Sequence, residues 1–71
     1  MLSKKDAVSQ ISSQLKGINI PEQRWIEIMD CVLKSDVIIV VSGGVAEEYY
    51  VNKKTYVTIV DFDNLKAEAE E

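Results

Sequence analysis

The run VIIVVSGGV at residues 37–45 decides the fold of this chain of 71 residues. Its first five residues are apolar and β-branched, which is typical of a buried strand. Gly43 and Gly44 then give a two-residue hairpin signal. Two more runs rich in Val, Ile, Thr and Tyr follow. We therefore expect a three-stranded antiparallel β-meander with strands at about residues 36–42, 45–51 and 55–61.

The second turn of this meander is expected at Asn52-Lys53-Lys54, where asparagine tolerates a positive φ. In the resulting register one face carries seven side chains: Ile38, Val40, Val45, Tyr49, Val51, Val57 and Ile59. The opposite face carries eight: Val37, Ile39, Val41, Ala46, Tyr50, Tyr56, Val60 and Phe62. Both faces of the predicted sheet are therefore apolar, whereas an antiparallel sheet usually keeps one face polar.

Two helices are predicted before the sheet, because apolar residues recur there at helical spacing. Ser3 and Asp6 resemble a capping box, and Gly17 can end a helix in the left-handed conformation, so a first helix is expected at about residues 4–16. Pro21 suits the first turn of a second helix, at about residues 21–34.

The short link between the two helices favours an antiparallel helical hairpin. The predicted architecture is a single α+β domain, residues 1–71, in which the hairpin packs on the sheet. Residues 66–71 are acidic and alanine-bearing, and we expect them to fray or to form a short exposed helix.

Composition restricts the means by which so short a chain can be stabilised. An unaided core of this size rarely supplies more than about 3–5 kcal/mol. Cys31 is the only cysteine and histidine is absent, which excludes a disulfide within the chain and a Cys/His zinc site. Association with a partner is the remaining route.

The longest apolar run is five residues and no apolar segment follows the N-terminal lysines, so we expect neither a membrane span nor a secretory signal. A cytoplasmic location is the default. The net charge is −4, with +2 in residues 1–20 and −6 in the rest. An acidic body disfavours direct binding to nucleic acid and is compatible with a basic protein surface.

The two apolar faces predict a partner, because two helices of about four turns can cover only one of them. A homodimer, formed edge to edge through the first strand or face to face, would cover the remaining surface. The alternative is a monomer that covers itself, with the C-terminal segment folded back and tyrosine hydroxyls outward. The expected contact residues are Ile38, Val40, Tyr49, Tyr50, Tyr56 and Phe62.

Motifs that carry chemistry are weak. Ser42-Gly43-Gly44 could be a phosphate loop, but a hairpin turn fits better because no helix begins at the glycines. Asp61 and Asp63, with Glu47 nearby, could hold Mg²⁺ or Ca²⁺, but acids at strand ends usually serve solubility. Glu47 and Glu48 point to opposite faces of a strand and cannot act as an acid/base pair. We therefore expect no enzyme, no catalytic residue, no cofactor and no metal.

The segments VVSGGV (residues 40–45) and VTIVDFDNL (residues 57–65) resemble those of a small class of uncharacterised bacterial and phage-type proteins. Members of this class carry a VVSGGV strand-turn and a closing V-x-V-x-D-[FY]-D-N strand. The resemblance covers about 25 residues of the C-terminal part and implies a small protein of phage or mobile-element type. It assigns no activity and no site residue.

The function expected from these observations is a non-enzymatic protein–protein interaction module of phage or mobile-element type that dimerises through its sheet. A larger host or phage protein is the other expected partner. The alternative is an acidic inhibitor, of the anti-CRISPR kind, that mimics nucleic acid in the groove of a host enzyme. The carboxylates that would stand in for phosphates are Glu47, Glu48, Asp61, Asp63, Glu68, Glu70 and Glu71.

Overall fold

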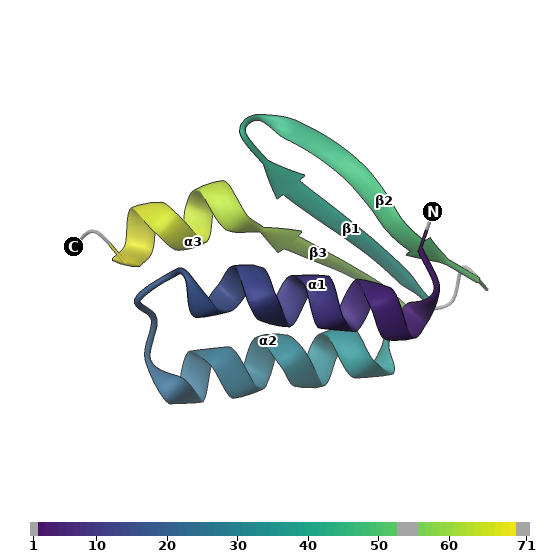
Figure 1. Ribbon diagram of the computed structural model, residues 1–71, viewed down its shortest axis with the longest axis horizontal. Helices are drawn as coiled ribbons and strands as arrows, with labels where there is room; N and C mark the ends of the chain where they lie inside the picture. Colours follow the sequence, from purple (N-terminus) through teal and green to yellow (C-terminus); the bar gives the residue numbers. More distant parts are fainter. Residues whose placement is uncertain (1, 53–55, 70–71) are drawn as a thin grey trace.

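Three helices and a three-stranded sheet make up the computed structural model, which describes residues 2–52 and 56–69. The elements in chain order are α1 (Lys4–Lys16), α2 (Glu22–Lys34), β1 (Val37–Ser42), β2 (Val45–Val51), β3 (Val57–Asp61) and α3 (Phe62–Ala69). Figure 1 shows α1 and α2 lying side by side as an antiparallel pair on one side of the sheet. The fold belongs to the α+β class, as the sequence predicts.

The helix α1 begins and ends where local chemistry allows it. The Ser3 hydroxyl accepts a hydrogen bond from the Asp6 backbone N–H at 3.2 Å and so caps the first turn. Ala7, Ile11 and Leu15, spaced four residues apart, form the buried stripe of this helix. Gly17 ends the helix with a φ of −81°, so the expected left-handed conformation at this glycine is wrong.

The helix α2 packs against α1 and the sheet through Met29 and Val32, which are buried. Pro21 lies just before its first residue, where a missing N–H costs nothing. At its other end the chain turns at Ser35, whose hydroxyl donates to the Cys31 carbonyl at 2.5 Å. The same hydroxyl is hydrogen-bonded to that of Thr58, which ties the end of α2 to β3.

The order of the strands is β2-β1-β3, with β1 in the centre. β1 and β2 form the predicted hairpin: Gly43 and Gly44 have φ angles of 60° and 76°, and Ser42 pairs with Val45. β3 is parallel to β1, with Val57 beside Val37. The sheet is therefore mixed, and the expected antiparallel meander is wrong.

The end of β2 and the start of β3 both lie at the N-terminal end of β1. The Asp36 carbonyl accepts from the Asn52 N–H at 2.9 Å, and the Tyr56 carbonyl accepts from the Asp36 and Val37 N–H groups at 2.9 and 3.1 Å. Residues 53–55, and with them most of the predicted turn at Asn52-Lys53-Lys54, lie outside the described residues. This arrangement pairs both edges of the most apolar strand, so the expected edge position of the first strand, and any dimer formed through it, is wrong.

A β-bulge in β2 changes which side chains of this strand face the helices. Ile38 pairs with Tyr50 and Ile39 with Glu48, which leaves Tyr49 as the extra residue. Both tyrosines consequently pack against the helical layer. The Tyr49 hydroxyl accepts a hydrogen bond from the Gln14 amide at 3.0 Å, and the Lys4 ammonium lies 5.9 Å from the centre of the Tyr50 ring.

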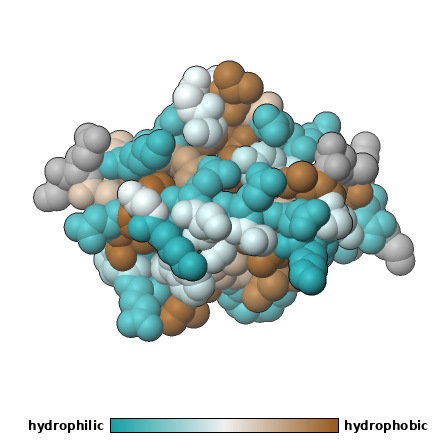
Figure 2. Space-filling view, viewed as in Figure 1, coloured by the Kyte–Doolittle hydropathy of each residue, from teal (hydrophilic) through white to brown (hydrophobic). Residues whose placement is uncertain are grey.

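The core lies between the sheet and the helices and includes two residues of α3. Phe62 and Leu65 are 1% and 4% exposed, so the segment after Asp61 is a packed helix that starts four residues before the predicted acidic tail. Glu70 and Glu71, at the end of that tail, lie outside the described residues. The outer surface around α1 is mostly hydrophilic in Figure 2, as expected for an amphipathic helix that buries its apolar stripe.

Two isoleucines on opposite faces of the sheet provide a matched test of which face is covered. Ile38 is fully buried, and Ile59 is 62% exposed. Removing one methylene through Ile38→Val should cost about 1 kcal/mol of unfolding free energy, because it leaves a small cavity in the core. The same change at Ile59 should stay within about 0.5 kcal/mol. Urea unfolding at low micromolar protein concentration measures both, and equal losses would contradict the assignment of the faces.

Candidate interaction surface

One face of the sheet is apolar and is not packed against any described helix. Strand alternation and the pairing registers place seven side chains on it, which we call the open face: Val37, Ile39, Val41, Ala46, Val51, Val57 and Ile59. None of the seven belongs to the core cluster, which takes Ile38, Val40 and Val60 from the sheet. The open face is therefore the apolar surface that the helical layer leaves uncovered.

Exposure within the open face rises from the central strand towards β3. Val37 is buried and Ile39 is half-buried, because side chains of both neighbouring strands flank them. Val57 and Ile59 on β3 are 53% and 62% exposed. Glu48 pairs with Ile39 and Asp61 with Val41, so the same face carries one acid on each edge strand.

The six predicted contact residues are distributed over both the core and the surface. Their positions in the chain are Ile38, Val40, Tyr49, Tyr50, Tyr56 and Phe62. Ile38, Val40 and Phe62 are buried in the core, where they hold the helices to the sheet. The tyrosines of β2 are half-buried beside α1, and Tyr56 alone of the six is exposed, at 49%. The exposed pair on β3, Val57 and Ile59, was not among the six. The meander register placed this pair on the face of Ile38 and Val40, whereas the structure places it on the opposite face.

The four predicted acidic residues do not form a cluster. Glu47 and Glu48 are exposed and lie on opposite faces of β2. Asp61 lies on β3, on the other side of β1, so it is not near Glu47 as the meander implied. Within residues 2–52 and 56–69, no three His, Cys, Asp or Glu side chains come together as a metal site requires.

Asp61 and Asp63 are used within the fold. Asp61 caps α3, because its Oδ1 accepts a hydrogen bond from the Asn64 backbone N–H at 3.0 Å. Asp63 reaches the tip of the β1–β2 hairpin, where its two carboxylate oxygens accept from the N–H groups of Gly43 and Gly44 at 2.9 and 2.8 Å. The hydrogen bonds from Gly44 and Gly43 stabilise the charged carboxylate and lower the pKa of Asp63.

The Asp63 contact, which we call the hairpin latch, joins the last helix to the first turn of the sheet. The sequence did not predict this contact, because apolar and polar residues alternate over residues 57–63 as they do in one continuous strand. A signal was present: Asp61 followed by Asn64 and a run of helix-forming residues is typical of a helix start.

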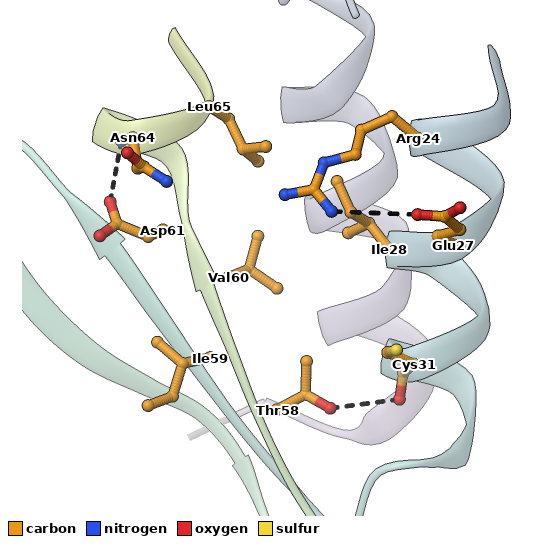
Figure 3. A pocket seen from close by; sticks show the side chains of 10 residues that line it. All are labelled: Arg24, Glu27, Ile28, Cys31, Thr58, Ile59, Val60, Asp61, Asn64 and Leu65. Atoms are coloured by element: carbon orange, nitrogen blue, oxygen red, sulfur yellow. Dashed lines mark hydrogen bonds and ion pairs between the residues drawn. The ribbon is translucent and has the colours of Figure 1, made fainter. Parts of the chain in front are cut away.

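A groove of about 320 Å³ runs along the outer edge of β3 (Figure 3). Residues of α2 form one wall, residues of β3 the other, and Asn64 and Leu65 of α3 border one end. At the opposite end the Thr58 hydroxyl oxygen lies 3.3 Å from the Cys31 carbonyl oxygen, which closes the groove. Sequence patterns gave no indication of it, because it depends on how α2 lies against an edge strand.

Arg24 is the basic residue of this groove and is already paired. Its guanidinium lies 4.0 Å from a Glu27 carboxylate oxygen and 3.8 Å from one of Glu68 on α3. With Asp61 on the β3 side, the acids at the groove outnumber the base. The groove therefore favours a basic ligand over an acidic one.

These features define an α+β protein with a helical layer on one face of a mixed sheet and an apolar open face on the other. No known protein family, curated protein sequence or solved structure matches the chain. No helix in the described part of the chain has both the length and the hydropathy to cross a membrane.

The hairpin latch predicts a specific dependence of stability on pH. Because the pKa of Asp63 is lowered in the folded protein, its stabilisation is complete above the ordinary carboxyl pKa. This stabilisation is lost as the pH falls through the lowered value. The melting temperature of the wild type should therefore decrease when the pH is lowered below about 4. Asp63→Asn should lower the melting temperature at pH 7 and should make this decrease at acid pH smaller.

Glu47→Gln is the matched control, because the described residues offer its exposed carboxylate no hydrogen bond. This variant should follow the wild-type curve. Thermal unfolding monitored by circular dichroism between pH 7 and pH 2.5 makes the comparison. Identical pH profiles for Asp63→Asn and the wild type would show that the latch does not stabilise the fold.

Proposed function

We propose that the protein is a non-enzymatic protein–protein interaction module that dimerises through the open face of its sheet. The observation that carries this proposal is the pair Val57 and Ile59, 53% and 62% exposed, beside the apolar residues of β1. Exposed apolar side chains that lie together favour contact with a partner, because association removes them from water. A second copy of the chain is the partner we propose first.

A second copy suits the open face because the contact would be self-complementary. In a two-fold arrangement the same patch meets itself, and two sheets can pack face to face at about 10 Å with their strands nearly aligned. The two acids on this face, Glu48 and Asp61, belong to the two outer strands. The apolar centre around Ile39 can then meet its own copy while the carboxylates stay at the margins, in contact with water.

The size of the open face indicates a weak dimer. Three strands about 4.8 Å apart and five residues long, at about 3.3 Å each, span roughly 250 Å² in projection. A standard interface buries about 800 Å² per partner. Because the open face is much smaller than a standard interface, we expect association in the micromolar range or weaker, before any further contacts from the rims.

The remaining chemistry of the chain agrees with a binding role. Asp61 and Asp63, the acids considered for metal binding, are engaged in hydrogen bonds that build the fold. Cys31 is exposed and free, which suits a protein of the reducing cytoplasm. These features support the proposal of a cytoplasmic protein with a binding role.

Substitution of one exposed isoleucine tests the dimer. Ile59→Lys should abolish self-association because it places an ammonium in the middle of an apolar contact. Sedimentation equilibrium from about 10 µM to 1 mM should show the wild type rising from 8.0 kDa towards twice that mass, with Ile59→Lys remaining at the single-chain value. The wild-type rise should persist in about 1 M NaCl, because apolar contacts are not screened.

Ile26→Lys is the matched control, since Ile26 is 47% exposed on α2, away from the sheet. This variant should associate as the wild type does. A wild type that stays at 8.0 kDa at the highest concentration, or an equal loss of association in both variants, would contradict the proposal.

A further inference from the structure

The outer edge of β3 carries backbone groups that no described residue binds. The Tyr56 carbonyl points towards β1, since it accepts from Asp36 and Val37. Backbone groups alternate in direction along a strand, so those of Thr58 also face β1. The N–H and C=O groups of Val57 and Ile59 consequently face away from the sheet.

The two edges of the sheet differ in how they are protected. β2 has the bulge at Tyr49, the charges of Glu47 and Glu48, and a hydrogen bond of 2.8 Å from the Leu2 N–H to the Tyr49 carbonyl. These are the devices that prevent an edge strand from pairing with another chain. The pairing of β3 with β1 is regular over residues 57–61, and the four backbone positions before Asp61 carry no charged side chain.

The free edge of β3 borders the groove against α2 (Figure 3). A strand added to β3 would lie about 4.8 Å from it, along the groove. In Figure 3 the side chains of Ile28, Val60 and Leu65 lie between the two walls, so an apolar side chain of the added strand has apolar neighbours. The excess of acid around Arg24 supplies a site for a basic side chain beyond the apolar part.

We propose that the β3 edge and its groove bind an extended segment of a partner protein, which adds to the sheet as a fourth strand. The segment alternates apolar and basic residues: the apolar ones enter the groove, and the basic ones lie on the opposite face of the added strand, where Asp61 is the nearby acid. Main-chain hydrogen bonds to Val57 and Ile59 give affinity, and the groove gives specificity. This site lies on the edge of the sheet, so a dimer formed through the open face leaves it accessible.

The probe for this site is a capped octapeptide that alternates lysine and valine. Titration into ¹⁵N-labelled protein, followed by two-dimensional NMR, should shift the Val57 and Ile59 amide signals and slow their hydrogen exchange. The same peptide methylated at alternate backbone nitrogens should bind at least about tenfold more weakly, because it cannot complete the ladder. A glutamate–valine peptide should also bind more weakly, since it meets the acidic groove.

Two variants at one position separate the edge from the open face. Ile59→Pro removes an outward N–H, a position where an edge strand accepts proline, and should weaken the peptide by about tenfold or more. Ile59→Thr keeps that N–H and should therefore lose less peptide affinity than Ile59→Pro, although it weakens the apolar contact of the proposed dimer. If Ile59→Pro fails to fold, the comparison of the methylated and unmethylated peptides on the wild-type protein still tests the proposal.

Three results would overturn the proposal. The first is unchanged binding of the methylated peptide, which would mean an electrostatic association alone. The second is perturbation of β2 amides in place of those of β3. The third is protection of the Val57 and Ile59 amides that increases with protein concentration in the absence of peptide, which would make a second copy the occupant of the edge. Mass measurements report the dimer separately, so either idea can fail without the other.

Discussion

The central strand β1 has apolar side chains on both of its faces, and this constraint shapes the rest of the structure. Ile38 and Val40, at 0% and 2% exposure, anchor the helices on one face. Ile39, between them, points the other way and is only half-buried. A strand of this composition is stable only when both of its edges are paired, and the β2 hairpin supplies just one of the two neighbours. β3 must therefore enter on the other side, parallel to β1.

The parallel entry of β3 also determines where α3 lies. Asp61 ends beside Val41, next to the hairpin tip, so the helix that starts at Phe62 meets both the core and the turn. Phe62 then packs into the core at the end of the sheet. The Asp63 carboxylate accepts hydrogen bonds from the N–H groups of Gly43 and Gly44, which would otherwise bind water. Positive φ angles at Gly43 and Gly44 let these neighbouring N–H groups converge on one carboxylate. One local turn is thereby joined to the last helix of the chain.

The parts of the fold that could be predicted from the sequence are those decided by neighbouring residues. The cap at Ser3, the helical stripes and the turn at Gly43 and Gly44 all follow from short-range rules. The strand order could not be predicted in this way, because a short link after β2 allows the third strand to pair either with β2 or with β1. The five apolar residues of β1 indicated a central strand, and only the assumption of a meander opposed them. The bulge at Tyr49 was equally hidden, since one extra residue reverses every later side chain in a strand.

Part of the sheet remains uncovered because the chain is too short to supply helices for both of its faces. Its helices bury Ile11, Leu15 and Val32 against one side of the sheet, which uses the apolar stripes of α1 and α2. The unpaired groups of the open face and those of the β3 edge are of different chemical types. The face offers side-chain area, so its contacts respond to shape and volume and little to salt. The edge offers backbone N–H and C=O groups of Val57 and Ile59, so its contacts respond to strand geometry and to a basic side chain near Asp61. The two contacts that we propose therefore depend on different chemistry, so a partner bound to one surface leaves the groups of the other unpaired.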